Sequence, residues 1–138
     1  MGRELDSRLE GAMRNPRILA VQPVLGCGNV LATAGFFERL GFSIAFLDSA
    51  EDPRYAALRR DGVELHLQWQ DAASWAPGGD RPVYRFLVAD VDGLFQEFSV
   101  AGVASDLRPV WDTAWGTREF HVRDPDGNGL QFYVPLQA

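Results

Sequence analysis

The sequence is poor in the residues from which disulfide and metal-bound frameworks are built. Its 138 residues include a single cysteine, Cys27, which excludes an intrachain disulfide and leaves no thiolate cluster for zinc. No apolar run approaches the length needed to span a bilayer. The charged N-terminal stretch, residues 1–17, has no apolar centre and does not match a secretory signal. We therefore expect a cytoplasmic protein that does not associate with membrane.

Basic residues are also fewer than acidic residues. Lys and Arg together number 13 against 19 Asp and Glu, which gives a net charge of −6. This balance argues against a general affinity for nucleic acid or for anionic membranes, because both reward positive charge. Hydrophobic residues make up 46% of the chain and charged residues 23%, the mix of a soluble globular protein. The length suits one compact domain, whose acidic surface would tolerate cationic small molecules.

A pattern of strands and helices occurs twice along the chain, and both copies contain a helix of the same length. The first helix is expected between Asn29 and Gly41, and the second between Asp90 and Gly102, so each pair of boundary residues is twelve positions apart. Predicted strands surround the helices at 18–25, 42–48, 55–60 and 63–69 in the first copy, and at 83–90, 103–111, 118–124 and 129–135 in the second. Such a repeat predicts an α+β fold of two tandem βαβββ modules.

The modules are expected at about residues 17–75 and 81–136 of a single domain, 17–138. A tail, residues 1–16, precedes the domain, and a linker rich in small residues, 70–82, joins the modules. Each module has one helix to cover one face of a four-stranded sheet, so the other face stays uncovered. The two halves must therefore share a concave surface.

Alternation along the strands sorts their residues into two faces. The residues expected to pack under the helices are Val63, Leu65, Leu67, Tyr84, Phe86, Phe120, Val122, Leu130, Phe132 and Val134. The opposite face collects Gln22, Glu64, His66, Gln68, Arg85, Glu119, His121, Gln131 and Tyr133. This second face is too polar for a sandwich core, so it is either the floor of a cleft or the solvent side of an antiparallel sheet.

Four stretches carry a family resemblance: "AVQPVLGCGNVLATAGFFERLGF" (20–42), "VELHL" (63–67), "VADVDGLFQEFSVAGV" (88–103) and "WGTREFHVRDPDGNGLQFY" (115–133). In these stretches the chain resembles the vicinal oxygen chelate superfamily, which includes glyoxalase I, the extradiol dioxygenases and the bleomycin resistance proteins. The similarity is greatest to the bleomycin-resistance branch. It implies a half-open mixed-sheet barrel, closed by a homodimer in which strands are exchanged at "WAPGGDRP" (75–82).

In the metal-dependent members of that superfamily, four strand positions supply the ligands. Carried over to this chain, they are Gln22, Glu64, Val83 and Gln131. One carboxylate, two amides and a valine do not suit a divalent ion, which needs anionic or imidazole ligands. The resemblance therefore implies a protein without metal or cofactor and without catalytic residues.

The alternative is that the protein is an enzyme. His66 and His121 share the polar face with Glu64 and Glu119, so they could hold a displaced metal, or act as acid and base with Glu64. Glu64 could also be a half-buried acid bonded to Arg85.

Without metal, the resemblance implies sequestration of a cationic or aromatic drug-like ligand in a groove between the modules. Aromatic faces stack on flat rings and hold cations, and nearby acids select positive charge. The tryptophans lie at strand ends or in loops, where they suit a ligand or a dimer interface. The predicted contacts are Phe46, Asp48, Glu64, His66, Trp69, Trp111, Trp115 and Gln131. A binder of an unrelated metabolite is the further alternative.

Overall fold

The computed structural model describes residues 16–75, 79–103 and 107–137. The predicted N-terminal tail lies outside the described residues apart from Pro16. Residues 76–78 of the predicted linker and 104–106 of a predicted strand also lie outside them. Everything that follows refers to the described ranges.

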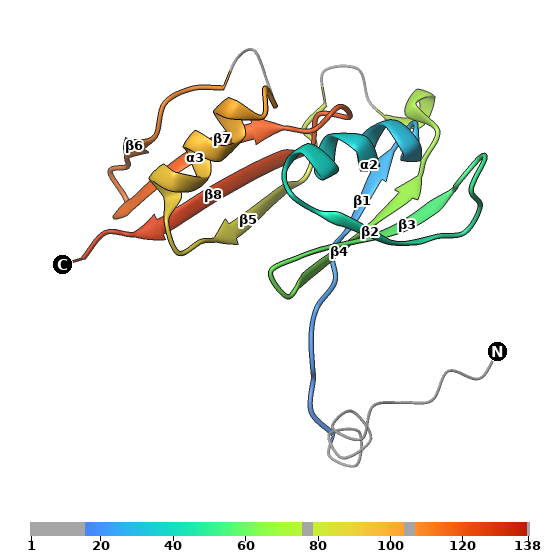
Figure 1. Cartoon of the computed structure of the whole chain (residues 1–138), viewed down its shortest axis with the longest axis horizontal. Coiled ribbons are helices and arrows are strands. Elements are labelled where there is room, and N and C mark those ends of the chain that lie inside the picture. Colours follow the sequence, from blue (N-terminus) through green and yellow to red (C-terminus); the bar gives the residue numbers. More distant parts are fainter. Residues whose placement is uncertain (1–15, 76–78, 104–106, 138) are drawn as a thin grey trace.

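The elements follow the predicted order of two βαβββ modules, so the α+β fold is confirmed (Figure 1). The first module comprises β1 (Val24–Cys27), α2 (Val30–Arg39), β2 (Ser43–Leu47), β3 (Tyr55–Arg60) and β4 (Val63–Trp69). A short 3₁₀ turn (Ala72–Ser74) follows. The second module comprises β5 (Val83–Leu87), α3 (Val91–Val100), β6 (Trp111–Asp112), β7 (Thr117–Arg123) and β8 (Gly129–Pro135). Each module forms one mixed sheet, in the orders β1-β4-β3-β2 and β5-β8-β7-β6, in which only the first pair is parallel.

The two helices begin and end as their sequences predict. The Asn29 side chain accepts a hydrogen bond from the amide of Ala32 at 3.0 Å, and the Asp90 side chain accepts one from Gly93 at 2.9 Å. Gly41 (φ 87°) and Gly102 (φ 65°) follow the helices in the left-handed conformation that ends them. In the described ranges, no helix combines the length and the apolar character that crossing a bilayer requires.

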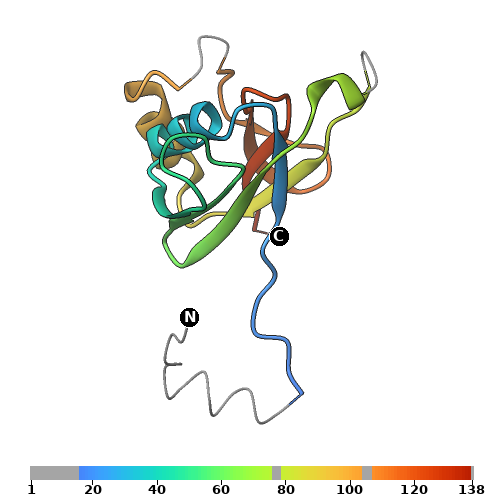
Figure 2. The ribbon, with the colours of Figure 1, turned by 90° about the vertical axis from the view of Figure 1, so that its right-hand side faces the viewer.

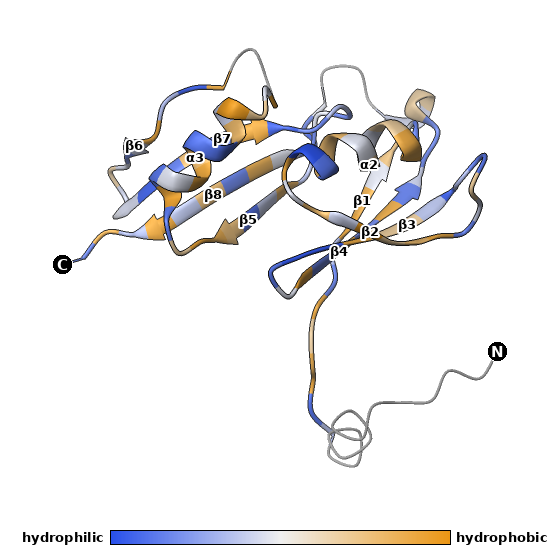
Figure 3. Ribbon diagram, in the orientation of Figure 1, coloured by the Kyte–Doolittle hydropathy of each residue, from blue (hydrophilic) through white to orange (hydrophobic). Residues whose placement is uncertain are grey.

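Both helices lie on the same side of the two sheets, as Figures 1 and 2 show from two directions. The core fills the space between helices and sheets, and Leu65, Leu67, Phe120 and Leu130 are fully buried there. Figure 3 shows the alternation of apolar and polar residues along the strands. The predicted register is therefore correct, and the opposite side of each sheet, here called the open face, has no helix over it.

The modules are joined by polar contacts at the turn between β7 and β8. The carboxylate of Asp126 accepts hydrogen bonds from Gly28 N (2.9 Å), just before α2, and from Thr33 Oγ1 (2.7 Å), within α2. The buried amide of Asn128 donates to the carbonyl of Gly26 at 3.1 Å. The turn formers that mark the C-terminal hairpin in the sequence thus also hold the second module to the first.

The first predicted strand, 18–25, is wrong at its start, because β1 begins only at Val24. Pro23 accepts a hydrogen bond from His66 N at 2.8 Å but has no N–H to donate, so the ladder stops there. Gln22 consequently lies before β1 and is exposed.

Two further expectations need correction. Of the described residues of the predicted strand 103–111, only Trp111 belongs to a strand, β6, and Pro109 lies in the irregular stretch before it, where it cannot donate to a ladder. Val63 is 46% exposed and not part of the core. It stands directly after the Asp61–Gly62 turn, at the start of β4, where it lines a cavity between the modules.

Candidate ligand-binding site

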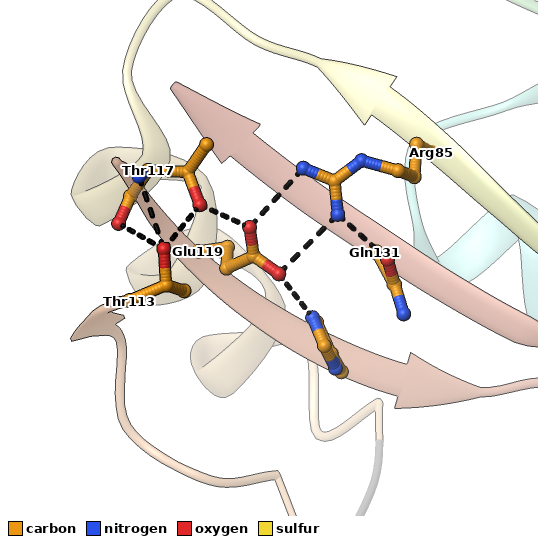
Figure 4. Close-up of polar contacts among 6 residues, drawn as sticks. Arg85, Thr113, Thr117, Glu119 and Gln131 are labelled. Atoms are coloured by element: carbon orange, nitrogen blue, oxygen red, sulfur yellow. Dashed lines mark hydrogen bonds and ion pairs between the residues drawn. The ribbon is translucent and has the colours of Figure 1, made fainter. Parts of the chain in front are cut away.

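Three strands of the second module bring Arg85, Glu119 and Gln131 together on its open face (Figure 4). The parallel pairing of β5 with β8 sets Arg85 beside Gln131, and β7 adds Glu119 from the next strand. The Arg85 guanidinium donates to both oxygens of Glu119, at 3.3 and 3.2 Å, and to Gln131 Oε1 at 2.7 Å. Charge-assisted contacts of this kind fix the guanidinium in one orientation.

Glu119 is a fully buried carboxylate on an otherwise accessible face. It accepts hydrogen bonds from Thr117 Oγ1 and, at 2.7 Å, shares one with His121 Nε2, in addition to those from Arg85. Burial raises the pKa of this carboxyl, but the bonds from Arg85, Thr117 and His121 outweigh burial and bring the pKa down to about 2. Glu119 is therefore ionised at neutral pH.

Aromatic rings border this polar group. The guanidinium of Arg85 lies over the ring of Tyr133 at 4.1 Å, and the ring of Trp111 meets that of His121 edge-on with centroids 4.8 Å apart. A hollow of about 570 Å³ opens beside Trp111 and His121. Its other lining residues are Leu107, Arg108, Pro109, Val122 and Arg123. A flat ring placed there would meet an indole, an imidazole and guanidinium groups.

The first module has a second polar network on its open face. Glu64 accepts a hydrogen bond from Arg59 Nε at 2.6 Å and shares one of 2.7 Å with His66 Nε2. His66 Nδ1 lies 2.6 Å from the hydroxyl of Tyr55. Hydrogen bonds from His66 and Arg59 hold the pKa of the Glu64 carboxyl below its ordinary value. The alternative in which Glu64 is bonded to Arg85 is wrong, because cross-strand register puts Arg59 opposite Glu64.

The two open faces also expose apolar side chains. By strand register, Val24 lies beside His66, and Phe46 lies in the same row on the other side of Ala57. Val83 and Leu87 lie on either side of Arg85 along β5, on the same face. They are among the most exposed large apolar residues of the strands. Such exposure on a sheet without a covering helix is typical of an interaction surface.

The structure separates the predicted contact residues into groups. Phe46, Glu64 and His66 gather on the open face of the first module, and Trp111 and Gln131 on that of the second.

The other predicted residues lie elsewhere. Trp69 is opposite the buried Cys27, on the helix-covered side, with Arg54 over its ring at 4.3 Å. Asp48 Oδ1 accepts bonds from the amides of Arg54 and Tyr55 and so closes the loop between β2 and β3. Trp115 lies in the β6–β7 loop and is 65% exposed.

Sequence reasoning missed Tyr55 and Arg59 as members of the first network. The Asp61–Gly62 turn contained the signal for Arg59, since a tight hairpin there sets Arg59 across from Glu64. No comparable signal linked Arg85 to Gln131, because the parallel pairing of β5 and β8 joins segments far apart in the sequence.

The four positions that resemble metal ligands do not fit a divalent cation. Gln22 lies outside the sheet, Val83 offers only hydrocarbon, and both oxygens of Glu64 are engaged by Arg59 and His66. Gln131 Oε1 faces the guanidinium of Arg85, whose positive charge opposes a cation at that place. Across residues 16–75, 79–103 and 107–137, no three His, Cys, Asp or Glu side chains are grouped as ligands.

Comparisons with known proteins agree with this architecture. The family model described as "Glyoxalase/Bleomycin resistance protein/Dioxygenase superfamily" matches residues 19–132, so the chain belongs to that superfamily. A bleomycin resistance protein of Geobacillus stearothermophilus is 25% identical over 131 residues, which cover 84% of this chain and 96% of that protein.

Two solved structures are similar over most of their length. The bleomycin-binding protein of the bleomycin producer Streptomyces verticillus, complexed with copper(II)-bleomycin, is 30% identical, with a TM-score of 0.69 and coverage of 88% and 98% of the two chains. The bleomycin resistance determinant encoded on the transposon Tn5 is 21% identical, with a TM-score of 0.72 and coverage of 84% and 97%. At 21% identity, the similarity to the Tn5 determinant shows that the two proteins share a fold.

The low pKa of Glu119 predicts a specific acid sensitivity. A carboxyl whose pKa is about 2 in the folded protein and near 4.5 when unfolded stabilises the fold above about pH 4.5, and this contribution is lost as the pH falls toward 2. Glu119→Gln should lower the free energy of unfolding at pH 7 by about 1–3 kcal/mol, since it removes charge-assisted bonds. Its stability should then fall less than that of the wild type between pH 5 and 2, as measured by denaturant titration. Glu38→Gln, on the exposed side of α2, controls for charge, and a slope shared by all three proteins would contradict the prediction.

Proposed function

We propose that the protein binds and sequesters a drug-like aromatic ligand in a groove over the open faces, without a metal ion. The observation that carries this proposal is the second module's open face, where Trp111 and His121 line a hollow and Glu119 links His121 to the fixed guanidinium of Arg85. Family membership supports it, as does similarity to a bleomycin resistance protein and to a bleomycin-binding protein. Stacking on Trp111 suits a flat heteroaromatic ring.

Binding accounts for the side chains better than the chemistry of the superfamily's metal enzymes does. The carboxylates of Glu64 and Glu119, on the open faces, are engaged by arginine and histidine. Groups held in this way orient their neighbours, and their lowered pKa values make them weak bases at neutral pH. The open faces therefore present hydrogen-bond donors and aromatic rings to a ligand.

One observation favours a second candidate, an acid–base enzyme. Tyr55, His66 and Glu64 form a chain of short hydrogen bonds, through which a proton on the Tyr55 hydroxyl could pass toward the carboxylate. A compound that is recovered chemically unchanged after prolonged incubation with the protein supports sequestration, whereas conversion that Tyr55→Phe abolishes would support the enzyme.

We further propose that two copies of the chain close the groove. The exposed Phe46, Val83 and Leu87 on the open faces need a cover, and a second sheet provides one of the same shape. Ligand would then lie at the seam, in contact with side chains of both modules. Exchange of strands at residues 75–82 remains part of this proposal, although 76–78 lie outside the described residues.

The proposed pairing predicts the oligomeric state. Light scattering coupled to size exclusion should give about twice the chain mass of 15.3 kDa at micromolar concentration. Leu87→Asp, which puts a charge on the open face, should shift the protein toward monomer. Val100→Asp, at the 79% exposed site on α3, is the matched control and should remain dimeric. A monomeric wild type would contradict the proposal.

The aromatic groove predicts which tryptophans matter. Trp111→Ala and Trp115→Ala should each weaken ligand binding by about 1–3 kcal/mol while the fold persists, as is typical for an aromatic residue at a binding hot spot. The measurement is a fluorescence titration with bleomycin and a panel of aromatic antibiotics. Trp69→Ala is the control, because Trp69 lies on the helix-covered side. A loss of thermal stability with unchanged affinity would show that Trp111 and Trp115 only pack, and the absence of any binding compound would refute the function.

A further inference from the structure

The open face of the second module is basic, although the whole protein has a net charge of −6. Arg85 and Arg123 lie on its strands, and Arg108 lines the hollow beside Trp111. The strands direct a single carboxylate, that of Glu119, to this face. Two of the module's other acids, Asp92 and Asp112, bind Arg118 instead. Charge is thus distributed unevenly around the module.

The carboxylate on this face is hidden from a ligand, and the guanidinium beside it is not. Glu119 has no exposed surface, whereas the Arg85 side chain is 37% exposed. Thr117, His121 and Arg85 occupy the lone pairs of Glu119. A molecule that approaches the sheet therefore meets positive charge first, and the buried acid serves to hold that charge in place.

Arg85 is held on two sides and available on a third. Glu119 and Gln131 take N–H groups on Nη1 and Nη2, and the ring of Tyr133 covers one face of the guanidinium. The bonds to Glu119 and Gln131 use both N–H groups of Nη1 and one N–H group of Nη2. Tyr133 also interacts with the guanidinium, and Glu119 and, to a smaller extent, Tyr133 raise the pKa of Arg85. The other edge of the planar fork, formed by Nε–H and the second Nη2–H, has the geometry that receives both oxygens of a carboxylate.

We propose that this face is an oxyanion subsite, in which Arg85 receives the carboxylate or phenolate of a planar aromatic ligand whose ring lies in the hollow at Trp111. The inference rests on the proposed binding function and names the ligand class within it. It selects an aromatic anion over the cationic drug that the acidic composition suggests. His121, Arg108 and Arg123 add donors and positive potential around the same hollow.

The test compares three probes with the same ring system and different charge. Isothermal titration calorimetry on the full-length protein is carried out with 2-naphthoate, 2-naphthamide and 2-naphthylmethylammonium. The carboxylate should bind about tenfold or more tighter than the amide, which corresponds to a charge-assisted hydrogen bond, and the ammonium should bind weakest. Added salt should reduce the preference for the carboxylate.

Matched variants assign the effect to Arg85. Because Arg85→Gln alone leaves Glu119 as a buried charge without its partner, the double variant Arg85→Gln/Glu119→Gln is used, with folding checked by circular dichroism. It should bind the carboxylate and the amide about equally. Arg85→Lys should keep part of the preference, since it retains the charge and loses the fork. Arg118→Gln is the control: Arg118 is similarly exposed and also paired with acids, but it lies on the helix-covered side, so the preference should persist.

The outcomes distinguish this inference from the function on which it rests. Equal affinity for carboxylate and amide, or tightest binding of the ammonium, would overturn the oxyanion subsite and leave sequestration standing. A preference that Arg118→Gln removes as fully as the double variant would show that the effect is not specific to Arg85 and would also overturn the subsite. If bleomycin binds and none of the naphthalene probes does, the subsite is refuted. If neither bleomycin, the antibiotic panel nor the probes bind, the proposed function itself fails.

Discussion

A single helix can cover only one face of a four-stranded sheet, and this constraint decides where the protein can interact. Each module uses its helix to bury one apolar strand face, with Phe120, Phe132 and Phe98 in mutual ring contact as the centre of the second module's core. The other face is left to side chains that must satisfy one another or meet a ligand. Alternation along the strands makes the division strict, because a shift of one residue would exchange the faces.

On both open faces, the partly buried polar side chains satisfy one another through the same kind of hydrogen-bond network. In each module a glutamate is bonded to an arginine and to the histidine two residues further along its own strand. In the second module the glutamate is more deeply buried. Thr117 donates a further hydrogen bond to Glu119, and Gln131 accepts one from Arg85. A buried ion pair is weak evidence for stability, since desolvation offsets much of the attraction. The ion pair between Arg85 and Glu119 instead orients the guanidinium of Arg85 on the open face.

Much of the fold was predictable, because it depends on patterns with a direct physical cause. The equal helix lengths, the capping residues Asn29 and Asp90 and the alternation in β4, β7 and β8 all follow from local chemistry. Errors arose where proline interrupts a ladder, before β1 and before β6.

The candidate site was less accessible to sequence reasoning. Glu64, His66 and Gln131 were placed on the correct faces, but the partners of the acids depend on which strands pair. The parallel neighbours β5 and β8 are separated by more than forty residues, so Arg85 could not be assigned to Gln131 and Glu119. The burial of Glu119 is likewise a property of the assembled sheet and of no local pattern.

We propose that the chain holds no metal ion at Gln22, Glu64, Val83 and Gln131, the four positions that resemble the metal ligands of the superfamily. Elemental analysis of the purified protein by mass spectrometry tests it most directly, with samples taken before and after incubation with zinc, nickel, iron and manganese salts and removal of the excess. We expect far less than one equivalent of any of these metals per chain in both samples. One tightly retained equivalent per chain, lost in a Glu64→Ala variant, would contradict it.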